Sequence, residues 1–151
     1  MLKKLLLFIV INFAALGLGS YLMGEGPQST WYQSLNFPPW MPPGWLFGVA
    51  WTTIMICFSI YMALLWVRVD PKHFVAIFIV QWILNVFWNP VFFAFHLDQL
   101  GLAIIISLTV VVHYMLWKYW KTLKYRSLLI APYTIWLLIA TSLNLYISIY
   151  N

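Results

Sequence analysis

The sequence predicts an all-α integral membrane protein, a bundle of five transmembrane helices. Of its 151 residues, 64% are hydrophobic and only 7% are charged, whereas a soluble domain has about 25% charged residues. The apolar residues form runs of about 20, the length a helix needs to cross roughly 30 Å of hydrocarbon. Strand-like alternation is absent. Because only helices and closed barrels satisfy the backbone in lipid, we expect helices.

We predict membrane spans at residues 5–23, 45–66, 74–95, 101–117 and 128–150, within one membrane domain covering residues 1–151. None of the five contains Asp, Glu, Lys or Arg. The first also resembles a secretory signal, with a basic start and an apolar middle. Its apolar run is longer than an ordinary signal core and no clear A-x-A site follows. We therefore expect it to stay in the protein as a span.

The connection between the first two spans, residues 24–44, is long and rich in proline and aromatic residues. Loops of this length are often lids or binding loops. An interfacial aromatic belt would explain some of the rings. It would not require prolines on both sides of a tryptophan, and proline stiffens a chain by fixing φ. We favour a rigid aromatic lid that contains Trp31, Tyr32, Phe37, Trp40 and four prolines, Pro38, Pro39, Pro42 and Pro43.

Three of the spans carry polar or aromatic side chains at helical spacing. The second span has an aromatic and sulfur-bearing stripe, the third combines amides with rings, and the fifth sets a large ring beside a small residue. Two interpretations stay open: core packing with hydrogen bonds between helices, or walls of a cavity. The stripes are Phe47, Trp51, Met55 and Phe58; Gln81, Asn85, Trp88 and Phe92; and Pro132, Trp136, Ala140, Leu143 and Asn144. Asn89 precedes Pro90, which should bend or loosen that turn.

The basic residues all fall on one predicted side of the membrane, whereas Glu25 and Asp98 fall on the other. This bias predicts a cytoplasmic N-terminus and a C-terminus outside. The net charge of +5 is therefore a topology signal and does not indicate nucleic-acid binding.

Several kinds of chemistry are disfavoured. The three carboxylates, Glu25, Asp70 and Asp98, lie in predicted loops, so no pair is available for acid–base work and none lies at membrane depth for proton coupling. Cys57 is the only cysteine, which leaves no disulfide or cysteine cluster for zinc. Neither a metal nor a required cofactor is expected. Ligation of haem iron by a histidine, such as His113 in the fourth span, is a weaker hypothesis than an ordinary hydrogen-bonded role.

Several motifs in order along the chain resemble the TspO/MBR family, the tryptophan-rich sensory proteins and translocator proteins once called peripheral-type benzodiazepine receptors. They are "GEG", "WY", "PPWMPPGWLFGVAW", then "Q…N..W.P.FF" and "PY..W...A..LN". The resemblance spans residues 24–144 by motif and the rest by span count. The chain looks like a bacterial member.

The resemblance implies a five-helix bundle, often a homodimer, that binds tetrapyrroles such as protoporphyrin IX and haem. Some bacterial members are reported to degrade protoporphyrin in light and oxygen, and the two tryptophans required match Trp51 and Trp136. The ligand-binding residues expected from the stripes and the resemblance are Trp31, Tyr32, Trp40, Pro43, Phe47, Trp51, Gln81, Asn85, Trp88, Trp136, Ala140 and Leu143.

The function expected is a tetrapyrrole receptor or sensor with photo-oxidative activity as an extension. The alternatives are a passive carrier of porphyrins or other lipophiles, and a scaffold whose aromatics only pack. Membrane lipid and a second copy of the chain are the other expected partners. Sterol recognition is doubtful because no basic residue follows the tyrosines of the fifth span, although "LWKYWK" at residues 116–121 fits a weak generic sterol pattern.

Overall fold

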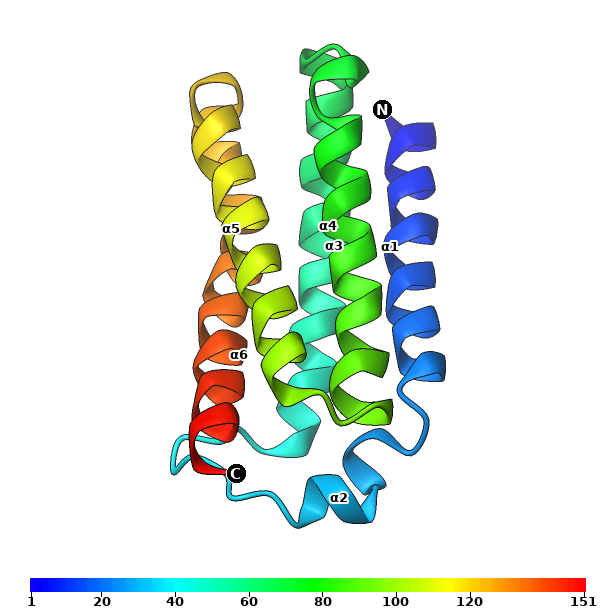
Figure 1. The fold of residues 1–151 in the computed structure, drawn as a ribbon. Helices are drawn as coiled ribbons and strands as arrows, with labels where there is room; N and C mark the ends of the chain where they lie inside the picture. Colours follow the sequence, from blue (N-terminus) through cyan, green and yellow to red (C-terminus); the bar gives the residue numbers. More distant parts are fainter.

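The computed structural model describes residues 1–151, and it contains only helices and turns. Five long helices run side by side, each antiparallel to the one before it in the chain (Figure 1). They are α1 (Leu2–Leu22), α3 (Gly44–Arg68), α4 (Val75–Asn89), α5 (Asp98–Leu123) and α6 (Ala131–Tyr150). The all-helical prediction is confirmed.

Four stretches are long and apolar enough to cross a membrane, and the last of them, Asp98–Tyr150, has 53 residues. One straight helix of that length would measure about 80 Å. The chain instead reverses in a 3₁₀ segment, Lys124–Ile130, so that α5 and α6 lie side by side (Figure 1). Helix α5 is longer than the apolar segment 101–117, because it continues to Leu123. Lys118 and Lys121, expected in a connection, are therefore helical.

Local sequence explains where the helices begin and end. Gly24, at φ 63°, follows α1 in a left-handed conformation that glycine tolerates best. Pro43 precedes α3, and Pro132 lies in the first turn of α6, where its missing N–H is not needed. Asp98 and Arg68 lie in the first turn of α5 and the last turn of α3, both favourable with the helix dipole.

The turn disturbed by Pro90 takes a defined form. Helix α4 ends at Asn89, and a π-helical turn, Pro90–Ala94, continues in the same direction. The Phe95 N–H donates to the Pro90 carbonyl oxygen at 2.9 Å, a five-residue step. Such turns re-aim side chains and are frequent at functional sites. Phe93 of this turn contacts Tyr32 of the lid, with ring centroids 5.3 Å apart.

The bundle is packed at one end and hollow at the other. Around the N-terminal end the interior is filled by large buried side chains from all five helices, among them Phe8, Phe58, Tyr61, Phe74, Met115 and Tyr133. Toward the lid the lining residues leave a cavity. The outer face carries exposed Val10, Val110 and Ile135, as expected for side chains that contact lipid tails.

Small residues on α1 let it approach α4 closely. Ala15 and Gly19 are both buried. A Cβ atom at Gly19 would lie 2.6 Å from the Asn89 side-chain nitrogen, closer than real contacts allow. A pair of small residues four apart permits close helix approach, and here that approach is made within one chain.

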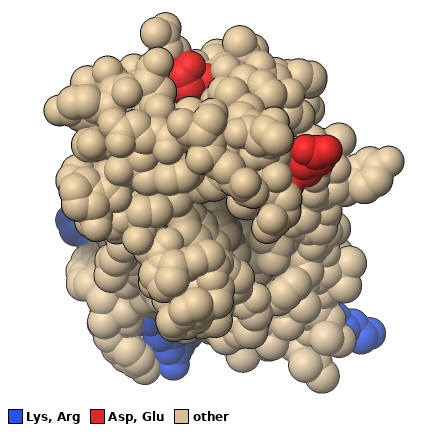
Figure 2. Space-filling view, turned by 90° about the horizontal axis from the view of Figure 1, so that it is seen from below, with Lys and Arg blue, Asp and Glu red and all other residues tan.

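Charge separates the two ends of the bundle. Figure 2 views the lid end, where acidic side chains lie on the near face and basic ones are visible only toward its edges. The N-terminus lies at the opposite end from the C-terminus and the lid (Figure 1). The basic residues near the N-terminal end are Lys3, Lys4, Arg68, Lys72, Lys118, Lys121, Lys124 and Arg126.

Candidate functional site

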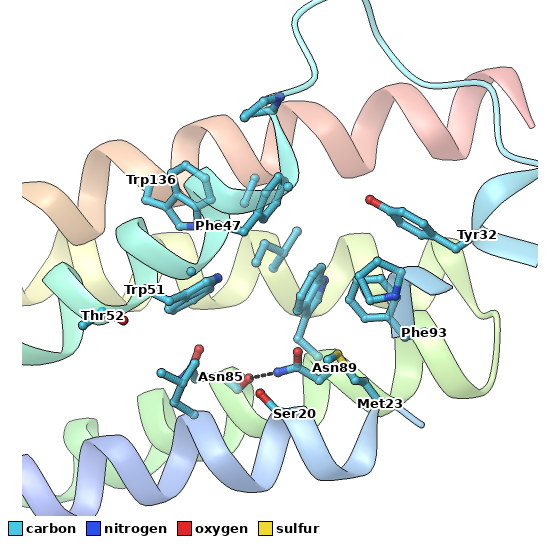
Figure 3. A pocket seen from close by; sticks show the side chains of 18 of the residues that line it. Ser20, Met23, Tyr32, Phe47, Trp51, Thr52, Asn85, Asn89, Phe93 and Trp136 are labelled. Carbon is cyan, nitrogen blue, oxygen red and sulfur yellow. Dashed lines mark hydrogen bonds between the residues drawn. The ribbon is translucent and has the colours of Figure 1, made fainter. Parts of the chain in front are cut away.

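A cavity of about 500 Å³ lies between the helices beneath the lid. It is lined by the lid-side halves of α1, α3 and α4, by the π turn, by one residue of α5, by α6 and by the lid itself (Figure 3). Its volume falls within the range of about 300–1,000 Å³ typical of small-molecule sites. The lining residues are Ala15, Leu16, Ser20, Met23, Pro27, Tyr32, Phe37, Met41, Pro42, Gly44, Phe47, Gly48, Trp51, Thr52, Asn85, Trp88, Asn89, Phe93, Ile105, Trp136 and Ala140.

One wall of the cavity is aromatic. Phe47 of α3 packs edge-on against Trp136 of α6, with ring centroids 5.2 Å apart and planes at 85°. Trp51, one turn farther along α3, packs edge-on against Tyr133 at 5.9 Å. These contacts fix the ring orientations while both indoles still line the same space (Figure 3). Trp51 and Trp136 therefore face one cavity from two helices.

The opposite wall is polar but uncharged. Ser20, Asn85 and Asn89 meet there from α1 and α4 (Figure 3). The Asn89 side-chain nitrogen donates to the Asn85 carbonyl oxygen at 3.1 Å, which holds the Asn89 amide against the cavity. No lining residue is Asp, Glu, Lys, Arg or His. The wall can therefore exchange hydrogen bonds with a ligand but cannot neutralise a formal charge.

The lid closes the cavity with a short helix, α2 (Thr30–Gln33), followed by an extended segment. The Ser29 hydroxyl caps this helix by accepting from the Tyr32 N–H at 3.2 Å. The Tyr32 ring lies 4.9 Å from Phe37 and 5.3 Å from Phe93, measured between centroids. Burial among these rings raises the pKa of the Tyr32 hydroxyl to about 12. Tyr32 therefore presents a neutral hydroxyl at physiological pH.

Side-chain contacts hold the outer edge of the lid to α6. The Asn36 N–H donates to the Asn151 side-chain oxygen at 2.7 Å, and the Asn151 amide nitrogen donates back to the Asn36 carbonyl at 3.2 Å. The Trp40 indole N–H donates to the Ser142 hydroxyl at 3.2 Å. The Trp40 ring also packs edge-on against Tyr146 at 5.6 Å. These contacts fix the lid at its α6 side.

At its other side the lid contacts the π turn. The Trp31 indole stacks on the His96 ring, with centroids 4.2 Å apart and planes at 15°. It also packs against Phe92 at 5.6 Å. His96 is one of two residues other than glycine with positive φ, at 57°, and this conformation turns its ring toward the lid tryptophan.

The structure brings seven of the twelve expected binding residues together around the cavity. They come from the lid, α3, α4 and α6, so the rings and amides of three separate stripes converge. These residues are Tyr32, Phe47, Trp51, Asn85, Trp88, Trp136 and Ala140.

The other five expected residues do not line the cavity. Trp31 and Trp40 fasten the lid from outside, and Trp40 is 54% exposed. Pro43 precedes the first turn of α3. Gln81 lies one turn deeper than Asn85, where its amide nitrogen donates to the Tyr133 hydroxyl at 2.8 Å. Leu143 is buried and is not among the residues that line the cavity. They support the site without touching its interior.

Sequence reasoning missed the contribution of α1. Ala15, Leu16, Ser20 and Met23 all line the cavity. The first span is mostly apolar, and its polar residues, Asn12 and Ser20, are too few to mark one face. The one usable signal was the pair of small residues, Ala15 and Gly19, which lets α1 close the cavity from its side.

Comparison with known proteins agrees with this architecture. The sequence profile of the TspO/MBR family matches residues 7–150. The chain belongs to the TspO/MBR family. Its relatives include Tryptophan-rich protein TspO of Archaeoglobus fulgidus, 32% identical over 100% of this chain and 96% of the relative. Protein CrtK of Rhodobacter capsulatus is 34% identical over 76% of this chain and 74% of the relative. Translocator protein of Homo sapiens is 30% identical over 82% of this chain and 75% of the relative.

Membership of the TspO/MBR family, together with the long apolar helices, makes the chain an integral multi-pass membrane protein. It also supports a role as a membrane sensor or receptor. In this TspO/MBR protein no three His, Cys, Asp or Glu side chains lie close enough together to hold a metal ion. The cavity itself is lined by aromatic rings, other apolar side chains and neutral hydrogen-bonding groups.

Proposed function

We propose that this protein is a membrane receptor for tetrapyrroles, which bind in the cavity under the aromatic lid. The observation that carries the proposal is the convergence of Trp51, Trp136 and Phe47 on one side of a neutral cavity and of Asn85 and Asn89 on the other. A flat macrocycle presents two apolar faces that can pack against aromatic rings. Each well-placed ring contact contributes about 0.5–1.5 kcal/mol beyond area burial.

The absence of charged residues from the cavity lining favours some tetrapyrroles over others. Because no lining residue is cationic, ionised propionates would be costly inside. They would have to lie outside the cavity, and the lid end of the bundle is acidic, with Glu25 before the turn Gly26–Gln28 and Asp98 at the start of α5. No histidine lines the cavity to ligate iron. Metal-free protoporphyrin IX therefore fits the site better than haem, and its dimethyl ester should bind at least as well as the free acid.

A light-dependent activity would extend this proposal. Indoles next to a photoexcited porphyrin can donate an electron, and molecular oxygen would serve as the final oxidant. Trp51 and Trp136 are the candidates because both line the cavity. No acid or base at membrane depth is required for the electron transfer.

We propose that the chain crosses the membrane five times, with its N-terminus in the cytoplasm. All eight Lys and Arg residues would then lie on the cytoplasmic side, as the positive-inside rule requires. The lid and the mouth of the cavity would face the outside of the cell or the periplasm. A homodimer remains a prediction from the family resemblance.

The proposal is tested by titrating purified protein with protoporphyrin IX while tryptophan fluorescence is followed. Trp51→Phe and Trp136→Phe should each weaken binding by about tenfold or less, because phenylalanine keeps an aromatic ring but covers less of the macrocycle than an indole does. Trp117→Phe is the matched control, because that indole is 77% exposed on α5 and outside the cavity. Unchanged affinity in both cavity variants would contradict the assigned site.

Illumination of the complex in air distinguishes a photo-oxidative activity from a receptor or a passive carrier. Bleaching of bound porphyrin beyond that of free porphyrin, lost in Trp51→Phe and Trp136→Phe, supports the photo-oxidative extension. Tight binding without such bleaching leaves a receptor or a passive carrier. Uptake of porphyrin into proteoliposomes then identifies the carrier.

A further inference from the structure

We propose that the basic end of α5 carries a second site, separate from the cavity, that binds the headgroup and upper acyl chain of an anionic phospholipid. The site is an open, shallow groove on the outer surface of α5, lined by His113, Leu116, Trp117, Lys118, Trp120 and Lys121. This inference does not depend on the proposed function, because no residue of the groove lines the cavity.

Helix geometry explains why the groove exists. His113, Trp117 and Lys121 follow one another at intervals of four, and Leu116 and Trp120 form a second row beside them. Rows at this spacing form ridges on a helix, and the furrow between two ridges accepts a partner's side chain. Here the ridges are mostly exposed, with Trp117 at 77% and Trp120 at 45%. No other helix of the chain contributes to the lining.

The position of the groove along α5 matches the membrane surface. Helix α5 has 26 residues and is therefore about 39 Å long, whereas the hydrocarbon layer is about 30 Å thick. Its last turns must therefore reach the headgroup region. Tryptophan favours that region, and lysine can extend its amine from an apolar surface into it. The groove thus runs from Leu116 in the apolar layer to Lys121 at the surface.

The charge of the groove selects an anion. Lys118 is held at the rim, where its amine lies 3.5 Å from the His73 carbonyl oxygen and 5.3 and 5.4 Å from the Tyr114 and Tyr119 ring centroids. The one carboxylate at this end, Asp70, accepts from the Lys72 N–H at 3.0 Å. Two amines over an aromatic, apolar furrow complement a phosphate attached to an acyl chain. A zwitterionic lipid would place its own cationic headgroup beside the two lysine amines, which would repel it.

The test is native mass spectrometry of the detergent-solubilised full chain, titrated with phosphatidylglycerol or phosphatidylcholine. We expect phosphatidylglycerol to be retained preferentially. The double variant Lys118→Gln/Lys121→Gln should weaken its binding by about fivefold for each lysine, because a basic residue near an anionic lipid surface contributes about 1 kcal/mol. The control is Lys3→Gln/Lys4→Gln, which removes the same charge from α1, on the opposite side of the bundle from α5 (Figure 1). It should keep the selectivity.

Several outcomes would overturn the proposal. Equal losses in the two double variants would mean diffuse surface charge and no site. Equal retention of both lipids would show that the headgroup charge is not recognised. Competition by inorganic phosphate at the same concentration as the lipid would show that the acyl chain does not contribute. Displacement by a sterol, or a dimer that dissociates in Lys118→Gln/Lys121→Gln, would assign the groove to another occupant.

Discussion

Substitution of Gly19 by alanine tests the close contact between α1 and α4 that closes the cavity. The added Cβ would lie 2.6 Å from the Asn89 side-chain nitrogen and 3.2 Å from its side-chain carbonyl carbon. Either the helices separate, an overpacking cost of about 1–3 kcal/mol, or the Asn89 side chain rotates. Rotation breaks its 3.1 Å hydrogen bond to the Asn85 carbonyl, at about 0.5–1.5 kcal/mol. Alanine also favours a helix over glycine by about 0.5–1 kcal/mol, a gain that Gly17→Ala shares without the clash. We therefore expect Gly19→Ala to be less stable than Gly17→Ala by about 0.5–3 kcal/mol.

The assay is thermal unfolding in detergent, monitored by circular dichroism. It is carried out as a double-mutant cycle that combines Gly19→Ala with Asn89→Ala. Each kcal/mol should lower Tm by about 2–4 °C for a chain of this size. Removal of the Asn89 amide should relieve the clash, so the double variant should be more stable than the two single losses predict. Gly17→Ala is the control, because a Cβ there meets nothing within 4 Å. A Gly19→Ala melting temperature at or above that of Gly17→Ala, with additive effects in the cycle, would refute the reasoning.

Three further predictions concern the cavity and its lid. Ala140→Phe fills the cavity beside Trp136 and should lower porphyrin affinity by tenfold or more without lowering Tm, whereas Leu138→Phe, on the exposed face of the same helix, should leave the affinity unchanged. Asn151→Ala removes the partner of the Asn36 N–H and should speed hydrogen exchange of that amide by about fivefold, for a bond contributing about 1 kcal/mol; exchange at the unsubstituted rate would show that the lid is held elsewhere. Because the pKa of Tyr32 rises from 10.0 in the unfolded chain to about 12 on folding, its contribution to stability is intact below pH 10 and is lost as the pH rises toward 12. Between pH 10 and 12, Tm should therefore fall less steeply in Tyr32→Phe than in the unsubstituted protein. Parallel plots of Tm against pH for the two proteins would exclude the effect.

Much of the fold could be predicted from local sequence. Runs of about 20 apolar residues define helices wherever lipid is the solvent, because the backbone has no other way to satisfy its hydrogen bonds. Turn residues such as Gly24 and Pro43 then mark where helices stop and start. Helix α5 extends beyond the predicted span 101–117, because Lys118 and Lys121 lower the hydropathy of a segment that remains helical. Charge marks the membrane boundary and does not mark the helix end.

The site was only partly predictable, since a stripe on one helix does not reveal which neighbour it faces. Gln81 and Asn85 share a face of α4, yet Gln81 bonds to Tyr133 in the packed half while Asn85 lines the cavity. Trp31 and Trp40 were grouped with Tyr32 from their place in the lid. The structure turns them to His96 and Ser142 and leaves Tyr32 over the cavity.

The sequence alone determined the membrane environment, the number of long helices, the charge difference between their ends and the family, because each depends on composition or on order along the chain. Tertiary structure alone decided that one half of the bundle is filled and the other hollow, and that α1 supplies a wall. A cavity is the volume that side chains from separate helices fail to fill. Its existence depends on how those helices approach one another, as where Gly19 meets Asn89.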